Sequence, residues 1–282
     1  MRTLAITALM SFVAAACTAG PAASAPPSPL TTSAAPIISV APTEAAASPD
    51  ASSVAALTYV ALGDSWPEGN HCGGCRTFAG RYADGLEAAL GEAVEFIDLN
   101  GERTTQSTAL LASLRQDREI RDAVARADVV MIATGPNEME GTGAAVADGT
   151  CGGDDGFDCI RALGDTWDAN FDASVAEVLA LRDGKPTAIR LVNAANPFLS
   201  VPQMVTEMGL PADFAMTGGA LLFELLTTAV CDAARTHGGQ CVDVRPILNG
   251  PELDQPTDED SPESHQAIAD ALVATGLAEL GR

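Results

Sequence analysis

The chain has 282 residues, of which 38 are Asp or Glu and 15 are Lys or Arg, so its formal net charge at pH 7 is −23. This excess of acid disfavours nucleic acids and anionic membrane surfaces as partners, because both are bound through clustered Lys and Arg. Composition divides the chain: residues 1–56 are almost all Ala, Ser, Thr, Pro and Val, whereas residues 57–282 alternate apolar runs with polar turns and are numerous enough to bury a core.

The N-terminus has the pattern of an export signal. Residues 1–17 read MRTLAITALMSFVAAAC, with one Arg, a short apolar run and small residues before Cys17. The run is shorter than the roughly 20 residues of a membrane-spanning helix, so we expect a cleaved signal peptide and an extracellular or cell-surface protein. Ala-Ala-Ala-Cys resembles a bacterial lipobox, which predicts lipidation of Cys17; the alternative is ordinary cleavage nearby with Cys17 discarded or free.

A linker and one folded domain follow. Residues 18–56 are rich in Pro and Ala and lack apolar periodicity, which predicts a disordered tether. In the rest of the chain, short apolar runs bounded by turn residues alternate with segments of helical periodicity. The expected strands are 57–62, 94–99, 128–134, 187–193 and 240–245. The expected helices are 76–90, 105–126 with a break, 166–182, 219–236 and 262–280. This alternation predicts a three-layer α/β/α sandwich around a five-stranded parallel sheet.

The cysteines support the same compartment. Without Cys17, six of the seven cysteines remain. Six thiols in an exported chain indicate a disulfide framework, and short loops favour neighbours in the sequence. The expected pairs are Cys72 with Cys75, Cys151 with Cys159, and Cys231 with Cys241.

Ligands bind to such sheets beyond the carboxyl ends of the strands. Gly63-Asp64-Ser65 directly follows the first expected strand, Asn100-Gly101 the second and Gly135-Pro136-Asn137 the third. In these motifs and their order, the chain resembles the GDSL or SGNH hydrolase superfamily. The resemblance implies a flavodoxin-like SGNH fold, Ser65 as nucleophile, and Gly101 and Asn137 as oxyanion donors. Trp66, Glu102 and Glu138 depart from the usual family residues.

The resemblance also implies an activity. Members hydrolyse esters through a serine acyl-enzyme, without cofactor or metal, and their substrates include lipids, acetylated sugars and small esters. We therefore expect a small-molecule, glycan or lipid ester as substrate, a monomer, and contact with a membrane only through the lipid anchor.

The general base is the open question. The family ends in Asp-x-x-His-Pro before its last helix, but here Asp258 is followed at that spacing by Ser261-Pro262. In one interpretation His265 has taken over as base, with Asp258, Asp260 or Glu263 orienting it. In the other, Ser261 caps the helix, Pro262 opens it, and His265 is a non-catalytic residue of its first turn.

The other two histidines are weaker candidates for the base. His71 lies in the loop that follows Ser65, and His237 ends a predicted helix. Two functions follow: a secreted or surface-tethered carboxylic ester hydrolase with Ser65, His265 and Asp258 as catalytic residues, or, as the alternative, a catalytically impaired binding lipoprotein that lacks the usual base.

Overall fold

A computed structural model of the protein describes residues 57–282. The expected signal peptide (1–17), the lipidation of Cys17 and the linker (18–56) lie outside the described residues and stay predictions.

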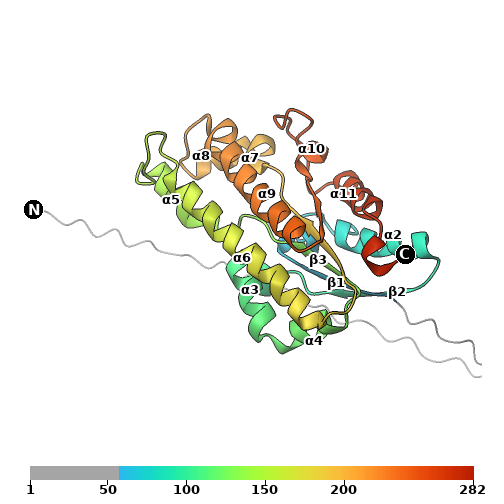
Figure 1. Cartoon of the computed structure of the whole chain (residues 1–282). Coiled ribbons are helices and arrows are strands. Elements are labelled where there is room, and N and C mark those ends of the chain that lie inside the picture. Colours follow the sequence, from blue (N-terminus) through green and yellow to red (C-terminus); the bar gives the residue numbers. More distant parts are fainter. Residues whose placement is uncertain (1–56) are drawn as a thin grey trace, which may run out of the picture. The chain divides into compact units, whose positions relative to one another are not determined.

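The five expected strands form one parallel sheet with the order β2-β1-β3-β4-β5 (Figure 1). β1 lies between β2 and β3, with Tyr59 opposite Phe96 on one side and Val129 on the other. This order brings the loops after β1 and β3 together at the carboxyl edge of the sheet. The strands are β1 (Leu57–Gly63), β2 (Val94–Asp98), β3 (Val129–Ala133), β4 (Ala188–Val192) and β5 (Gln240–Val242).

Helices cover both faces of the sheet, which confirms the predicted sandwich. One face packs against α2 (Phe78–Leu90) and α11 (Pro262–Ala274). The other packs against α3 (Ser107–Gln116), α4 (Arg118–Arg126), α6 (Asp158–Arg182) and α9 (Gly218–Thr236). The break expected within 105–126 is the junction of α3 and α4, where the Asp117 side chain caps α4 by accepting from Glu119 N and Ile120 N.

Other helices differ from the expectation. α6 begins at Asp158, earlier than predicted, and α11 ends at Ala274, after which a 3-10 turn covers Ala278–Leu280. Gly164 interrupts the apolar pattern of α6 because it faces Leu225 of α9, where an added Cβ would lie 3.0 Å from a methyl carbon. The short elements that the sequence did not reveal are α1 (Ser65–Glu68), a 3-10 turn (Glu102–Thr104), α5 (Met139–Ala147), α7 (Pro197–Ser200), α8 (Pro202–Glu207), a second 3-10 turn (Phe214–Met216) and α10 (Arg245–Leu248).

The segment Phe214–Thr236 is long and apolar enough to cross a membrane by length and composition alone. In the structure, its helix α9 packs along α6 and contributes Leu222, Phe223 and Leu226 to the core. Burial inside the domain therefore accounts for its apolar character.

All three expected disulfides are present. Cys72–Cys75 closes the loop after α1, Cys151–Cys159 closes the loop before α6, and Cys231–Cys241 joins α9 to β5. Their Cα atoms lie 5.4, 4.9 and 5.0 Å apart, within the usual range for disulfides.

A buried ion pair joins the sheet to the C-terminal segment. The Arg190 side chain on β4 is fully buried, and its two terminal nitrogens lie 2.9 and 3.1 Å from the carboxylate oxygens of Glu279. Arg190 Nε also donates to Thr275 Oγ1 at 2.6 Å. The guanidinium is thus satisfied almost entirely by residues near the end of the chain.

Candidate active site

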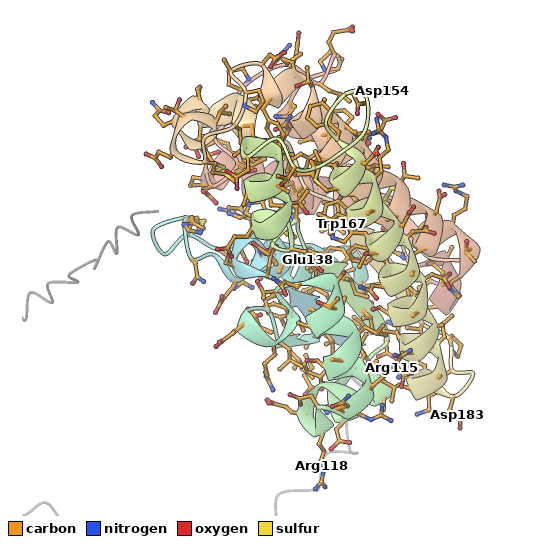
Figure 2. The ribbon with its side chains drawn as sticks, turned by 90° about the vertical axis from the view of Figure 1, so that its left-hand side faces the viewer. Arg115, Arg118, Glu138, Asp154, Trp167 and Asp183 are labelled. Atoms are coloured by element: carbon orange, nitrogen blue, oxygen red, sulfur yellow. A yellow bond between two sulfur atoms is a disulfide. The ribbon has the colours of Figure 1, made fainter. Side chains whose placement is uncertain are left out.

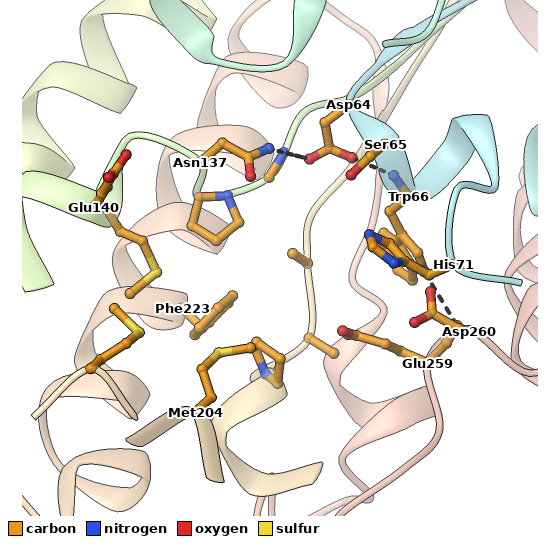
Figure 3. Close-up of a pocket in the computed structure, with 17 residues that line it drawn as sticks. Asp64, Ser65, Trp66, His71, Asn137, Glu140, Met204, Phe223, Glu259 and Asp260 are labelled. Carbon is orange, nitrogen blue, oxygen red and sulfur yellow. Dashed lines mark hydrogen bonds between the residues drawn. The ribbon is translucent and has the colours of Figure 1, made fainter. Parts of the chain in front are cut away.

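Asp64 fixes the turn that presents Ser65. Its buried carboxylate caps α1 by accepting from Trp66 N at 2.9 Å, and it also accepts from Gly135 N at 2.7 Å and Asn137 Nδ2 at 3.1 Å (Figure 3). One side chain therefore ties the loop after β1 to the loop after β3. Residue 135 has to be glycine, because an added Cβ would lie 2.7 Å from Asp64 Oδ2.

Two opposing effects act on this carboxyl group. Burial raises the pKa of Asp64 above its usual value, and the hydrogen bonds from Trp66, Gly135 and Asn137 oppose that rise by favouring the charged form. Ser65, the first residue of α1, thus lies beside a buried acid that three N–H groups hold in place.

Asn137 lies next to the turn that carries Ser65, as the motif predicts, but its amide already makes hydrogen bonds. Besides Asp64, Asn137 Nδ2 donates to Thr105 O at 2.9 Å. The expected donation to an oxyanion would require the Asn137 amide to leave one of these acceptors.

The neighbouring Glu138 has a structural role. Its carboxylate accepts from Ser107 Oγ at 2.5 Å and Thr108 N at 3.3 Å at the start of α3, and from Trp167 Nε1 at 3.1 Å on α6. Figure 2 labels Glu138 and Trp167 close to one another, in agreement with this hydrogen bond. The longer Glu side chain in place of Asp joins the third loop to two helices.

Gly101 departs from the expectation for an oxyanion donor. Its N–H already donates to Gly63 O at 2.8 Å, inside the protein. It has a φ of 113°, which favours glycine, and it precedes the 3-10 turn that begins at Glu102. The structure therefore assigns Gly101 to shaping the loop rather than to donating into the site.

The structure does not bring His265 to Ser65. The imidazole is fully buried, stacks on Phe78 with ring centroids 5.7 Å apart, and accepts from Phe78 N at Nδ1. Its Nε2 has no hydrogen-bond partner among the described residues, and one ring nitrogen lies within 4.8 Å of the sulfur atoms of Cys72 and Cys75. Burial, and then the charge of Arg81, lower the pKa of His265.

The start of α11 matches the second interpretation of the sequence. Ser261 is the N-cap and accepts from Ser264 N, and Pro262 is the first helical residue. The expected partner Asp258 uses its backbone carbonyl to accept from Ser261 Oγ and Ser264 Oγ, and within residues 57–282 it makes no hydrogen bond to His265. The predicted pair of His265 and Asp258 is therefore not assembled here.

Ser65 lines a cavity of about 470 Å³ at the carboxyl edge of the sheet. Its wall combines apolar side chains with titratable groups, and Glu140 lies across the cavity from His71, Glu259 and Asp260 (Figure 3). The apolar lining comes from Pro136, Met139, Ala194, Ala195, Pro197, Met204, Met208 and Phe223, and the titratable lining from Asp64, His71, Glu140, Glu259 and Asp260. This size and mixture are typical of a site for a small molecule.

Sequence reasoning missed Glu259 and gave little weight to His71 and Asp260. Glu259 is held in place by its backbone carbonyl, which accepts from Trp66 Nε1 at 3.2 Å. Burial, together with the charges of Asp260, Asp64 and Asp258, raises the pKa of Glu259 to about 7. The run of acids at 258–260 was a visible signal, but only Asp258 and Asp260 were considered, as possible orienting acids for His265.

This raised pKa predicts an effect on stability. Glu259 takes up a proton more readily in the folded than in the unfolded chain, so its contribution to stability is full below about pH 4.5 and is lost as the pH rises through about 7. Glu259→Gln cannot ionise. Its free energy of unfolding should equal that of wild type at pH 4.5 and should be higher than that of wild type at pH 8 by about 2 kcal/mol.

Urea unfolding at both pH values tests this, with the exposed Glu252→Gln of the same loop as control. If the free energy of unfolding differs between variant and wild type by the same amount at pH 4.5 and pH 8, ionisation of Glu259 does not destabilise the folded protein.

Comparisons with known proteins agree with the fold. No protein-family model matches the chain, and no curated protein matches its sequence. Among solved structures, the lipase Lip_vut3 from a goat rumen metagenome shares 21% identity with a TM-score of 0.56, over 78% of this chain and 98% of the lipase. Phospholipase A1 from Streptomyces albidoflavus NA297 shares 13% identity with a TM-score of 0.51, over 79% of this chain and all of that enzyme. Residues 57–282 thus share the fold of these two ester-hydrolysing enzymes.

Proposed function

We propose that the protein is a carboxylic ester hydrolase that acts at or outside the cell surface through an acyl intermediate on Ser65. The observation that carries the proposal is the position of Ser65: it opens α1 at the carboxyl edge of the sheet and lines the cavity described above. The turn around it is held by Asp64, so the hydroxyl is presented on a rigid element.

The lining of the cavity suggests how an ester would lie. The acyl chain would occupy the apolar part, beside Met139, Met204 and Phe223, where burial of its methylene groups is favourable. The carbonyl carbon would then face Ser65. The alcohol portion would lie toward His71, Glu259 and Asp260. There, the leaving alkoxide and the attacking water can exchange protons with side chains.

Covalent labelling tests the nucleophile directly. The full chain is incubated with a fluorophosphonate probe, digested and analysed by mass spectrometry. We expect one adduct on the peptide that contains Ser65, because phosphonylation needs an activated hydroxyl in a site that admits an ester analogue. An unlabelled Ser65 peptide, with ester turnover no faster than in Ser65→Ala, would refute the proposal and favour a protein that binds without turnover.

A further inference from the structure

The proposed ester hydrolysis needs a base for Ser65, and the structure removes His265 from that role. His265 is fully buried, and its Nδ1 accepts a hydrogen bond from Phe78 N. It does not line the cavity that Ser65 lines. His237 pairs with Asp172 at 2.9 Å and is likewise not part of that lining. One imidazole, that of His71, does face the cavity.

The loop from Gly69 to Cys75 brings His71 to the wall of the cavity that Ser65 also lines. Gly69 ends α1 with a left-handed φ of 89°, and Gly69 N and Asn70 N both donate to Ser65 O. The Cys72–Cys75 disulfide then closes the loop immediately after His71. The loop is thus anchored on both sides of His71, and in Figure 3 the imidazole lies on the same side of the cavity as Ser65 and Asp260.

The titratable groups that line the cavity together with this imidazole are acidic. They are Asp64, Glu140, Glu259 and Asp260, and no Lys or Arg among residues 57–282 lines it. Burial raises the pKa of Asp260, and the charge of His71 acts in the opposite direction on the same carboxyl group. Asp260 is therefore a carboxylate close enough to the imidazole of His71 to interact with it.

We propose, on the basis of the esterase function above, that His71 is the general base for Ser65 and that Asp260 is its positioning residue. The base therefore comes from the loop after α1, and the acid from the loop before α11. The usual arrangement, in which one C-terminal loop supplies both, is replaced by two loops that meet over the nucleophile.

The proton balance follows the usual serine mechanism. The Ser65 Oγ–H proton passes to His71 as Oγ bonds to the carbonyl carbon. The imidazolium returns that proton to the alcohol oxygen as the bond between the carbonyl carbon and that oxygen breaks. Water then gives a proton to His71 while its oxygen bonds to the acyl carbon, and Ser65 leaves with the proton as the acid is released.

The test is kcat/KM for p-nitrophenyl butyrate from pH 5 to 9, measured on the full chain. His71→Ala and His71→Gln should each lose about 10²- to 10⁴-fold, with partial recovery of His71→Ala by added imidazole. Asp260→Asn should lose less, and the loss should fall mainly on kcat rather than on KM, because Asp260 acts through the imidazole of His71. Asp260→Glu should restore part of the rate.

Matched controls are His237→Ala and Asp254→Asn, which should stay within twofold of wild type, and urea unfolding shows whether each variant is folded. If Ser65 is required but folded His71→Ala and His71→Gln keep the wild-type rate, the inference is overturned; loss in Glu259→Gln would then identify Glu259 as the base. A wild-type rate equal to that of Ser65→Ala refutes the proposed function and the inference together.

Discussion

Replacing Ser65 with alanine is expected to lower kcat/KM for p-nitrophenyl butyrate by at least ~10⁴-fold, because loss of the nucleophile of a serine hydrolase removes the covalent pathway. The variant should fold normally. The backbone of Ser65 and the Asp64 cap of α1 are unchanged by the substitution, and the Ser65 hydroxyl makes no hydrogen bond to any residue of 57–282. Initial rates are measured over a range of substrate concentrations for variant and wild type. The melting temperature of each protein shows whether it is folded.

Ser113→Ala is the matched control, since it removes a hydroxyl on α3 that donates to Arg103 O and does not line the cavity. Its rate should equal that of wild type. A Ser65→Ala variant that keeps more than a tenth of the wild-type rate would mean that the ester is hydrolysed elsewhere, or by water without an acyl-enzyme.

The second large effect is on stability. Glu279→Ala should lower the free energy of unfolding by about 3 to 5 kcal/mol, because it leaves the fully buried guanidinium of Arg190 without its counter-charge. Burial by itself raises the pKa of Glu279, but hydrogen bonds and the charge of Arg190 hold it below its usual value. The contribution of the pair is therefore present above about pH 4.5 and is lost as the pH falls through the lowered pKa of Glu279.

Urea unfolding at pH 7 measures this loss, and two variants isolate its cause. Glu92→Ala breaks the more exposed pair with Arg282 and should cost no more than about 1 kcal/mol. The double replacement Arg190→Met with Glu279→Leu should recover most of the loss, since no charge is then buried. A double variant as unstable as Glu279→Ala would show that packing, rather than the unpaired charge, is responsible.

Much of the fold could be predicted because the deciding signals are local. Each buried strand is a short apolar run between turn residues, and the three disulfides join neighbouring cysteines. The start of α6 was missed because Gly164 breaks the apolar pattern, and its reason, the close approach of Leu225, lies in another helix. Short helices such as α7 and α8 depend on the packing of their loops and carry no periodicity.

The site was less predictable because its geometry depends on contacts between distant segments. Ser65 and Asn137 could be placed from the ends of their strands, and the structure puts both beside Asp64. The sequence could not show that the Gly101 N–H donates to Gly63 O, or that Phe78 N donates to His265 Nδ1. Likewise, only the return of the loop after α1 brings His71 into the cavity lined by Asp260.

The hydrogen bond from Trp66 Nε1 to Glu259 O joins residues 193 positions apart, and thereby makes the site depend on both ends of the domain. The segment that carries Ser65 is synthesised early, whereas the loop that completes the cavity comes almost last. Closing so long a loop of chain is slow, because its entropic cost precedes the contacts that offset it. A partly made or partly refolded chain therefore holds Ser65 without a finished cavity around it, and assembly of the cavity marks the completion of folding rather than its beginning.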